Sequence, residues 1–496
     1  MQTALTQDAS TMPHHTRPRA TARRTLAGTG TAALVAVLAL ALAGCGGTPK
    51  APAPSDAWVE PAFERAPHSG WSTAGDEVVF SFASVGDSRQ DPTNPDPTTL
   101  IPPLTGSLLE QDRIWLQNTR AWSRILRAVQ DQKASMLVVN GDIVMGYGRS
   151  SVPEAWASRP PSVNDVAASD IARLQRQYAY WRGMVAGLFE TGTYVLPVPG
   201  NHETQCSDTV TTQKGACRKG KSAYAENEDA WRANMGDLIV DTRRFNAVTG
   251  FEASQVSGID RATAPGPAEG FTTDQSKLSY SFDVKIVGGL LHFAVINTFA
   301  TGQDGVAPVQ WLARDLEQAR ARGARQIFVF GHKPAFNYNA MAIRDKVFGP
   351  DGLDPTPAGR TPGSKAFWKV IVDNGATYFA GHLHVMHLDR IALPTDPAQP
   401  LAAVGTRETT PRGAAWQVLV GSGGSPFDAT LEGRCPDCRT PKLNEPTDRY
   451  YAWARVLVHR SGRVSLEIWG FDDKFGPARV LKVVNSLQSP ENRPQP

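Results

Sequence analysis

The sequence predicts an α/β fold with a mixed sheet, and three observations support this prediction. Six short apolar runs each end at a glycine followed by polar residue types that bind metal ions or phosphate. Segments between several of these runs carry apolar residues three to four positions apart, which is the periodicity of amphipathic helices. Two further pairs of apolar runs flank glycine-containing turns and indicate antiparallel hairpins. Alternating strands and helices are typical of α/β domains.

The six apolar runs are the predicted strands that carry the chemistry. They are VVFSFASVGD (78–87), SMLVVNGD (135–142), YVLPVPGNHE (194–203), QIFVFGHKP (326–334), ATYFAGHLH (376–384) and WQVLVGSGG (416–424). In open α/β sheets, ligands bind outside the carboxyl ends of the strands. We therefore expect one edge of a sheet to gather Asp87, Asp142, Asn201, His202, His332, His382 and His384. Carboxylates, an amide and imidazoles form a divalent-metal site of mixed nitrogen and oxygen type, which indicates a hydrolase.

Helices and hairpins fill the chain between these runs. The apolar spacing predicts helices over residues 108–129, 166–188, 309–321 and 365–372. Hairpins are predicted from residues 279–283 with 291–296, and from 451–459 with 464–470. We expect the strand-rich segments after the last helix to form a second sheet packed on the first.

The N-terminus resembles an export signal. Four arginines precede an uncharged apolar stretch over residues 31–43, which is too short to span a membrane. This predicts a signal peptide of lipoprotein type over residues 1–44. The sequence Leu42-Ala43-Gly44-Cys45 resembles a bacterial lipoprotein box, so we expect Cys45 to be lipidated and to anchor the chain outside the cytoplasm. The alternative is an ordinary signal peptide and a secreted protein.

The rest of the chain is predicted to be one domain behind a tether. Residues 45–74 form the predicted tether, residues 75–485 a single domain, and residues 486–496 a disordered tail. Insertions are expected near residues 91–103, 203–276 and 350–363, where long polar or Pro-rich stretches interrupt the α/β pattern. The leader carries the whole formal charge of +3, so the remainder is neutral and offers no basic patch for nucleic acid. The sequence does not indicate an oligomeric state.

The cysteines other than Cys45 fall in two close pairs. These are Cys206 with Cys217, and Cys435 with Cys438. An exported chain meets an oxidising compartment, where near pairs usually form disulfides. Three connectivities are possible, and we favour the local one; a redox motif at Cys435 to Cys438 and zinc binding are the less favoured alternatives.

The order of the motifs resembles the calcineurin-like metallophosphoesterase superfamily. Gly-Asp, Gly-Asp, Gly-Asn-His-Glu, Gly-His and Gly-His-Leu-His follow one another between about residues 78 and 425. The resemblance implies a four-layer α/β/β/α sandwich of two mixed β-sheets. It also implies two divalent or trivalent metal ions (Mn, Fe or Zn) and an enzyme that hydrolyses phosphate mono- or diesters. A metal-activated hydroxide would attack phosphorus.

The resemblance also assigns roles to individual residues. Asp142 matches the aspartate that bridges the two metals. The remaining ligands are matched by Asp87 and His384 for the first metal, and by Asn201, His332 and His382 for the second. His202 matches the catalytic histidine, a general acid for the leaving group.

One position departs from the family pattern. The first motif is usually Asp-x-His, but here it is Asp87-Ser88-Arg89, and arginine has no lone pair for a metal. Either the first site is weaker and uses water or Gln90, or Arg89 binds a substrate phosphate oxygen, or it points outward to a surface carboxylate. We favour the phosphate contact and count Arg89 as catalytic with His202. If Arg89 marks lost turnover, the alternative function is a catalytically weakened surface lipoprotein that binds phosphate ligands.

Three further residues near these motifs are interpreted as structural. Met145 occupies the position of the metal-bound tyrosine of purple acid phosphatases, and Tyr147 follows two residues later. We interpret Tyr147 as a loop aromatic, with a pocket wall as the open alternative. His292 lies inside a predicted strand and His387 three residues past Gly-His-Leu-His, and both are interpreted as structural.

Overall fold

A computed structural model describes the folded part of the chain. It describes residues 72–73, 76–92, 110–335, 348–349, 352–353, 363–393, 402–404, 413–427 and 450–487, with short gaps at 209, 213–214, 216, 218–221, 240, 253–254 and 258–263. All of these residues belong to one compact unit, Pro61–Pro496. The predicted signal peptide, Cys45, Cys435 and Cys438 lie outside the described residues, as do almost all of the tether and the tail. Within the described residues, none of the helices combines the length and the apolar character that crossing a membrane requires.

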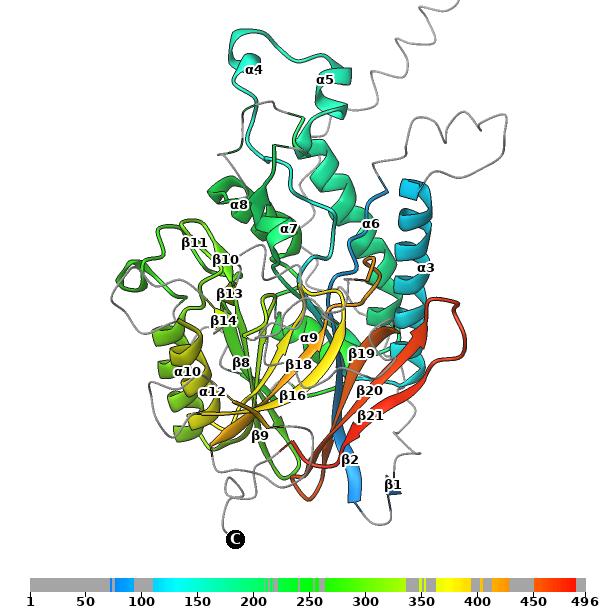
Figure 1. Cartoon of the computed structure of the whole chain (residues 1–496), viewed down its shortest axis with the longest axis vertical. Helices are drawn as coiled ribbons and strands as arrows, with labels where there is room; N and C mark the ends of the chain where they lie inside the picture. The colour runs from blue at the N-terminus through cyan, green and yellow to red at the C-terminus, as the bar shows by residue number, and fades with distance from the viewer. Residues whose placement is uncertain are drawn as a thin grey trace, which may run out of the picture. The chain divides into compact units, whose positions relative to one another are not determined.

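The first sheet is mixed and has seven strands (Figure 1). Its order is β21-β20-β19-β2-β3-β4, and β1 pairs with β2. The strands are β1 (Ser72–Thr73), β2 (Asp76–Val85), β3 (Met136–Asn140), β4 (Tyr194–Val198), β19 (Tyr450–His459), β20 (Val464–Asp472) and β21 (Arg479–Val484). Strands β2, β3 and β4 run parallel, whereas β19 to β21 run antiparallel to their neighbours.

The second sheet is also mixed and has eight strands. Its order is β17-β16-β18-β15-β12-β9-β8-β7, with β9, β12, β15 and β18 parallel. The strands are β7 (Val256–Ser257), β8 (Tyr280–Ile286), β9 (Gly289–Ile296), β12 (Ala324–Gly331), β15 (Thr377–Ala380), β16 (Met386–Ala392), β17 (Ala402–Val404) and β18 (Ala414–Val420). The predicted hairpin of β8 and β9 is confirmed, with Tyr280 opposite Val295.

An aromatic core joins the two sheets face to face. The ring of Phe82 on β2 has its centroid 4.9 Å from that of Phe328 on β12, 5.6 Å from Phe293 on β9 and 5.7 Å from Phe379 on β15. All four rings are fully or almost fully buried. Each such side chain contributes about 2 kcal/mol or more through burial, and the edge-to-face contacts add to that. The core therefore holds the two sheets against each other.

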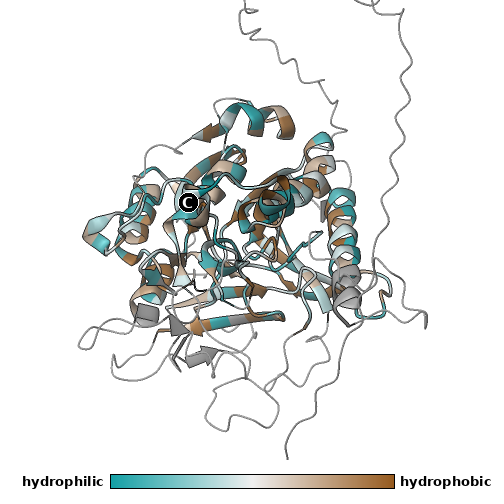
Figure 2. Cartoon of the chain, turned by 90° about the horizontal axis from the view of Figure 1, so that it is seen from above, coloured by the Kyte–Doolittle hydropathy of each residue, from teal (hydrophilic) through white to brown (hydrophobic). Residues whose placement is uncertain are grey.

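Helices cover the outer faces of both sheets. Helix α3 (Glu110–Asp131) and α6 (Asp170–Glu190) pack on the first sheet, and the rings of Trp122 and Trp181 stack 6.5 Å apart between them. On the second sheet, Ile327 and Val329 of β12 face away from Phe328 and pack with α10 (Val309–Ala321) and α12 (Gly363–Asp373). Figure 1 shows α10 and α12 at the left, the strands in the middle and α3 and α6 at the right. The helices carry both hydrophobic and hydrophilic residues (Figure 2), as expected of amphipathic layers. The four-layer α/β/β/α sandwich is confirmed.

Two sequence predictions about elements need correction. The predicted helix over residues 166–188 is two helices, because the Ser169 side chain accepts a hydrogen bond from the N–H of Ala172 and begins α6 anew after α5 (Val163–Ala167). The C-terminal hairpin forms as predicted, but β19 pairs with β2 in the first sheet rather than in the second. Only β15 to β18, among the strands after the last helix, belong to the second sheet.

The predicted insertion over residues 203–276 is partly core. It contains α8 (Ala225–Met235) and α9 (Thr242–Thr249), and their residues Trp231 and Phe245 are fully buried. Its polar composition reflects helices that bury only one face. Cys206 and Cys217 form a disulfide here with their Cα atoms 5.6 Å apart, so this half of the favoured connectivity is confirmed.

The remaining short elements lie in the connections. They are α4 (Ala155–Ser158), α7 (Asn201–Thr204), a 3₁₀ turn (Pro267–Glu269), and the strand pairs β5 (Gln205–Cys206) with β6 (Ser222–Ala223), β10 (Phe299–Ala300) with β11 (Gln303–Asp304), and β13 (Phe348–Gly349) with β14 (Gly352–Leu353).

Candidate metal centre

The candidate residues follow strands of both sheets, not of one sheet as predicted. The first three apolar runs form β2, β3 and β4 of the first sheet, and the other three form β12, β15 and β18 of the second. Parallel pairing keeps the strand ends level, with Val85 opposite Val139 and Asn140 opposite Val198. The sequence period identifies strands but not the sheet that each joins, which is why a single edge was expected. The structure brings all seven predicted side chains together where the two sheets meet.

The backbone at the strand ends has a conformation that favours glycine. Asp87, Asp142 and His382 have φ values of 63°, 51° and 72°, in the left-handed region, where a non-glycine residue costs about 1–2 kcal/mol. A Cβ on Gly381 would collide with Oδ2 of Asp87, so the glycine before His382 allows the two strand ends to approach. Such strain is typical of sites that project side chains toward a ligand.

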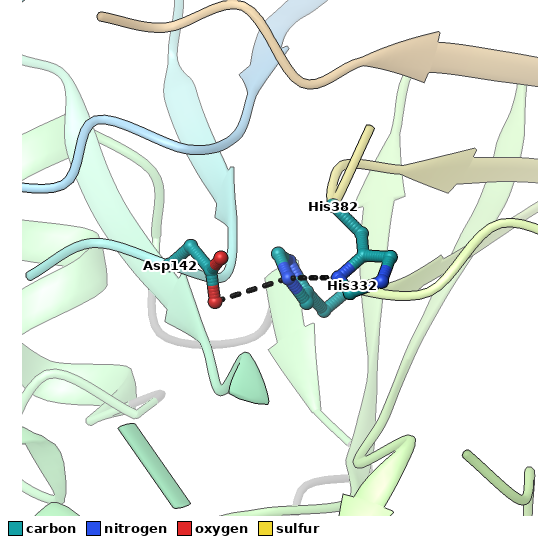
Figure 3. Close-up of side chains that lie close together, drawn as sticks. All are labelled: Asp142, His332 and His382. Carbon is teal, nitrogen blue, oxygen red and sulfur yellow. Dashed lines mark hydrogen bonds and ion pairs between the residues drawn. The ribbon is translucent and has the colours of Figure 1, made fainter. Parts of the chain in front are cut away.

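Four side chains form what we call the imidazole-rich group: Asp142, Asn201, His332 and His382. The His332 Nε2 atom lies 3.0 Å from Oδ1 of Asp142, 3.0 Å from Oδ1 of Asn201 and 3.2 Å from Nδ1 of His382. The His382 Nδ1 atom lies 2.8 Å from the same Asn201 oxygen. Figure 3 shows the carboxylate and the two imidazoles pointing toward one another. Four potential metal-donor atoms therefore converge on one small volume.

Three side chains form what we call the carboxylate-rich group: Asp87, Asp142 and His384. Their potential donor atoms all lie within 4.8 Å of one another, and the His384 Nε2 atom is 3.5 Å from Oδ1 of Asp87. The Asp87 Oδ1 atom is buried and accepts no hydrogen bond from any described residue. Its Oδ2 atom accepts one from the N–H of His382, 2.7 Å away. Asp142 is the member common to both groups.

Backbone carbonyls fix the proton positions of three histidines. The Nδ1 atom of His332 lies 2.6 Å from the Asn140 carbonyl oxygen, that of His384 lies 2.7 Å from Pro426 O, and that of His202 lies 2.5 Å from Met145 O. A carbonyl only accepts, so each Nδ1 carries the proton. The Nε2 atom of each ring is thereby directed to the site, the arrangement in which proteins hold metal-binding histidines.

His202 lies beside both groups on helix α7. Its backbone N–H donates to Oδ1 of Asp142 over 3.0 Å, and its Nε2 atom is 3.5 Å from Oδ2 of the same carboxylate. The ring packs on Tyr147, with centroids 3.8 Å apart. His202 is thus held next to the shared aspartate.

Arg89 contacts the shared aspartate, not a surface carboxylate. Its Nη2 atom donates to Oδ2 of Asp142 over 3.1 Å, and its side chain is 20% exposed. The Gln90 side chain is engaged elsewhere: it donates to Ser88 O over 2.6 Å and accepts from Thr119 Oγ1 over 3.1 Å. Two of the sequence-based alternatives, an outward-pointing Arg89 and Gln90 as a ligand, therefore do not match the structure.

Two residues of the site were missed or undervalued from the sequence. Buried Glu203 accepts hydrogen bonds from the N–H groups of Asp142, Gly200 and Val144, at 2.9, 2.7 and 3.2 Å. It ties together the turns after β3 and β4. Tyr147, interpreted from the sequence as a loop aromatic, accepts a hydrogen bond from Nδ2 of Asn201. For Glu203, the only signal in the sequence was its place in Gly-Asn-His-Glu. For Tyr147, no local pattern indicated the contact with Asn201.

The charges of the site shift its pKa values in opposite directions. Burial by itself lowers the pKa of His332, but the carboxylates of Asp142 and Asp87 raise it to about 9. Burial opposes ionisation of Asp142, yet the positive charges of His202 and His332 hold its pKa well below the usual range. Burial raises the pKa of Asp87 well above its usual range, against the charge of His332, and burial together with Asp142 raises that of Glu203 to about 8. A cation would favour the deprotonated forms of these ligands, so metal binding should release protons.

The donor set fits metal ions. Two imidazole nitrogens, an amide oxygen and a carboxylate oxygen face one another in the imidazole-rich group, with contacts of 2.8 to 3.2 Å. In the carboxylate-rich group, the buried Asp87 Oδ1 atom has an unused lone pair within the described residues. Mixed nitrogen and oxygen ligands of this kind suit Mn, Fe or Zn. Two adjacent groups with one shared carboxylate suit a dinuclear centre.

Comparisons with known proteins find similar solved structures but no similar curated sequence. No curated protein sequence matches the chain. Solved structures similar to it are a purple acid phosphatase from yellow lupin (Lupinus luteus; 11% identity, TM-score 0.44, 84% of this chain and 55% of that one), a dimetal phosphatase from Danio rerio (11%, 0.38, 83% and 100%) and GAP50 of Plasmodium (11%, 0.36, 83% and 90%). The chain spans about 55% of the length of the lupin protein.

A family model covers most of the site. The model of the calcineurin-like phosphoesterases matches residues 115–386, which include five of the six predicted metal ligands. That match is more than half of the chain. This protein therefore belongs to the calcineurin-like phosphoesterase family.

Proposed function

We propose that the protein hydrolyses phosphate mono- or diesters with two metal ions, outside the cytoplasm. The observation that carries the proposal is the pair of ligand groups that share Asp142 next to His202. In this proposal one metal ion is held by Asp142, Asn201, His332 and His382, and the other by Asp87, Asp142 and His384. When bound, the ions would supply positive charge to the phosphoryl oxygens and lower the pKa of a water molecule.

His202 is the proposed general acid. Its Nδ1–H donates to the carbonyl of Met145, so Nε2 is the atom that would donate a proton to the leaving oxygen. The 3.5 Å distance to Oδ2 of Asp142 lets that carboxylate stabilise a protonated ring. The role predicts a selective defect: His202→Ala should slow hydrolysis of esters with poor leaving groups about a hundredfold or more, and activated esters less.

Arg89 is the proposed contact for a phosphoryl oxygen. One N–H of its guanidinium is used by Asp142, whereas its Nε atom has no acceptor among the described residues. A partly exposed guanidinium fixed by a buried carboxylate is preorganised for an anionic oxygen, because the carboxylate holds its plane before substrate arrives. This supports the phosphate contact over an outward orientation.

The location outside the cytoplasm rests on the leader and the cysteines. The leader with its four arginines ends directly before Cys45, and the Cys206–Cys217 disulfide suits an oxidising compartment. We propose a lipid anchor at Cys45. Metabolic labelling with a radioactive fatty acid, followed by membrane fractionation, tests this: Cys45→Ser should lose both label and membrane association, and a labelled variant would contradict the anchor.

Hydrolysis itself is tested with two chromogenic esters. The purified chain, loaded with manganese, should hydrolyse p-nitrophenyl phosphate, bis-p-nitrophenyl phosphate or both, and the ratio of the two rates defines the preference for mono- or diesters. No turnover of either ester or of a nucleotide panel, together with saturable binding of phosphate, would favour the weakened phosphate-binding protein instead.

A further inference from the structure

Tyr147 lies in a loop that is clamped onto the helix of His202. Its backbone N–H donates to the carbonyl of His202 over 2.9 Å, and its own carbonyl accepts from the N–H of Ser207 over 3.0 Å. Tyr147 has a φ of 60°, a left-handed conformation that is rare for an aromatic residue. At Gly146, with a φ of 51°, a Cβ atom would collide with the carbonyl of His202. The loop therefore approaches α7 closely, and its backbone is fixed to His202 and Ser207 on either side of the Tyr147 side chain.

The Tyr147 side chain contacts two residues of the site. Its hydroxyl accepts a hydrogen bond from Nδ2 of Asn201, and its ring packs on the His202 ring with centroids 3.8 Å apart and planes at 42°. Tyr147 is buried, with 6% of the residue exposed. Asn201 and His202 are consecutive in the chain, so this one residue contacts both side chains at the start of α7.

The hydroxyl contact fixes the amide of Asn201. With Nδ2 directed to Tyr147, the amide oxygen faces His332 and His382 at 3.0 and 2.8 Å. An amide free to rotate would present oxygen and nitrogen by turns, and only the oxygen can bind a cation. Residues that orient a ligand from outside typically change metal affinity by about ten- to a hundredfold.

The ring contact fixes His202 by a different route. The imidazole has a hydrogen bond to Met145 O on one side and the Tyr147 ring against its face. Together they restrict rotation about the side-chain bonds, so that Nε2 remains beside Asp142. Positioning of this kind matters for proton transfer, which requires the donor within hydrogen-bond reach of the leaving oxygen.

We propose that Tyr147 is a positioning residue for both Asn201 and His202, through its hydroxyl and its ring respectively. The inference rests on the proposed function for the roles of those two residues. It assigns separate tasks to two parts of one side chain, and two substitutions separate them. Tyr147→Phe removes the hydroxyl and keeps the ring, whereas Tyr147→Leu removes both.

The first measurement is manganese binding to the metal-free full chain by titration calorimetry. Tyr147→Phe should weaken the tighter manganese equivalent about tenfold. The matched control is Tyr194→Phe, at the start of strand β4 and away from the ligand groups. It removes a buried hydroxyl that donates to the carbonyl of Leu238 over 3.0 Å. Wild-type affinity in Tyr147→Phe, or an equal loss in Tyr194→Phe, would overturn the hydroxyl task.

The second measurement is the ratio of rates on p-nitrophenyl phosphate and phenyl phosphate, which differ in leaving-group pKa. Tyr147→Phe should keep the wild-type ratio, whereas Tyr147→Leu should shift it in the same direction as His202→Ala. An unshifted ratio in Tyr147→Leu, or a shift already complete in Tyr147→Phe, would overturn the ring task. If no ester is hydrolysed by any variant but Tyr147→Phe still binds manganese more weakly, the proposed function fails while the hydroxyl task stands.

Discussion

The two ligand groups share one aspartate but differ in what surrounds them. In the imidazole-rich group, His332, His382 and Asn201 supply imidazole nitrogens and an amide oxygen, and their contact distances lie between 2.8 and 3.2 Å. The carboxylate-rich group has two acids and one histidine, with the His384 and Asp87 atoms 3.5 Å apart. It also has Arg89, a permanent cation 3.1 Å from the Oδ2 atom of the shared Asp142.

The difference shows how one arginine can give two adjacent ligand groups unequal affinities for a metal ion. A fixed positive charge next to the carboxylate-rich group competes with a metal ion for Oδ2 of Asp142. Two unit charges 4 Å apart interact by about 4 kcal/mol at a dielectric constant typical of a partly exposed site, so the repulsion of a nearby metal ion is not negligible. We therefore expect the imidazole-rich group to bind a metal ion more tightly, although it has fewer carboxylates.

The largest effect is expected where the two groups meet. Asp142→Asn removes the only carboxylate of the imidazole-rich group and one of the two in the carboxylate-rich group. We expect activity to fall about a thousandfold or more, since several kcal/mol of transition-state stabilisation depend on the metals, and both manganese equivalents to weaken. Steady-state assays on p-nitrophenyl phosphate, with metal content measured on the same sample, check this. Unchanged metal binding in a folded variant would argue against a shared ligand.

Single-histidine variants distinguish the two groups. His332→Ala should weaken the tighter manganese equivalent about a hundredfold or more, whereas His384→Ala should affect only the weaker one. Titration calorimetry on metal-free protein separates the two equivalents. His387→Gln is a suitable control, because burial lowers the pKa of this neutral histidine on β16 to about 3, and it belongs to neither group. Equal losses in both alanine variants would contradict the asymmetry.

Removing Arg89 should reduce the difference in manganese affinity between the two groups. Arg89→Ala should raise the affinity of the weaker manganese equivalent about tenfold, because the competing charge is gone. The same variant should raise the KM for phosphate esters if Arg89 also contacts the phosphoryl group. Calorimetry should therefore show tighter manganese binding, and steady-state kinetics on the same preparation should show a higher KM for the ester. Two equally tight equivalents in the unaltered protein would show that Arg89 has no such effect.

Much of the fold and of the site could be predicted from local patterns. Glycines after apolar runs identified β2, β3, β4, β12, β15 and β18, and helix α10 begins and ends at the predicted residues. Those signals are local, because a strand end and an amphipathic face leave their marks within a few residues. Strand direction predicted that the seven side chains lie at the carboxyl ends of strands, but their convergence also depends on the packing of the two sheets against each other. Their metal-binding and catalytic roles remain proposals.

What could not be predicted depends on contacts between distant segments. Nothing in residues 450–472 indicates that β19 pairs with β2, because a hairpin has the same pattern in either sheet. The task of Glu203 depends on three backbone groups in two turns, and that of Tyr147 on a close approach of its loop to α7. Contacts of polar side chains with distant backbone groups leave no periodic pattern in the sequence, so they could not be predicted from it.

His292, a buried histidine outside the site, can be compared with His332, because both come from strands of the second sheet or directly follow one. His292 on β9 is fully buried, and both its ring nitrogens face carboxylates: Nδ1 lies 2.7 Å from Asp283 and Nε2 lies 2.9 Å from Asp315. Arg322 donates to Asp283, and Ser281 donates to Asp315. His332, by contrast, has a carbonyl at Nδ1 and faces the other metal-ligand candidates with Nε2. His292 therefore suits a proton at each nitrogen, and His332 suits a metal ion.

The contrast predicts a pH dependence of stability, the smallest of these effects. Burial by itself lowers the pKa of His292, but the hydrogen bonds and charges of Asp283 and Asp315 raise it above its usual value. A raised folded-state pKa means that the contribution is complete below the unfolded-state value near 6.5 and is lost as the pH rises through the folded-state value. Losing one charge-assisted hydrogen bond should cost about 1–3 kcal/mol. Urea unfolding at pH 6 and pH 9 should therefore show a larger decrease in unfolding free energy for the unaltered protein than for His292→Gln, which cannot titrate. Parallel decreases in both proteins would mean that the proton on His292 is not what the two carboxylates stabilise.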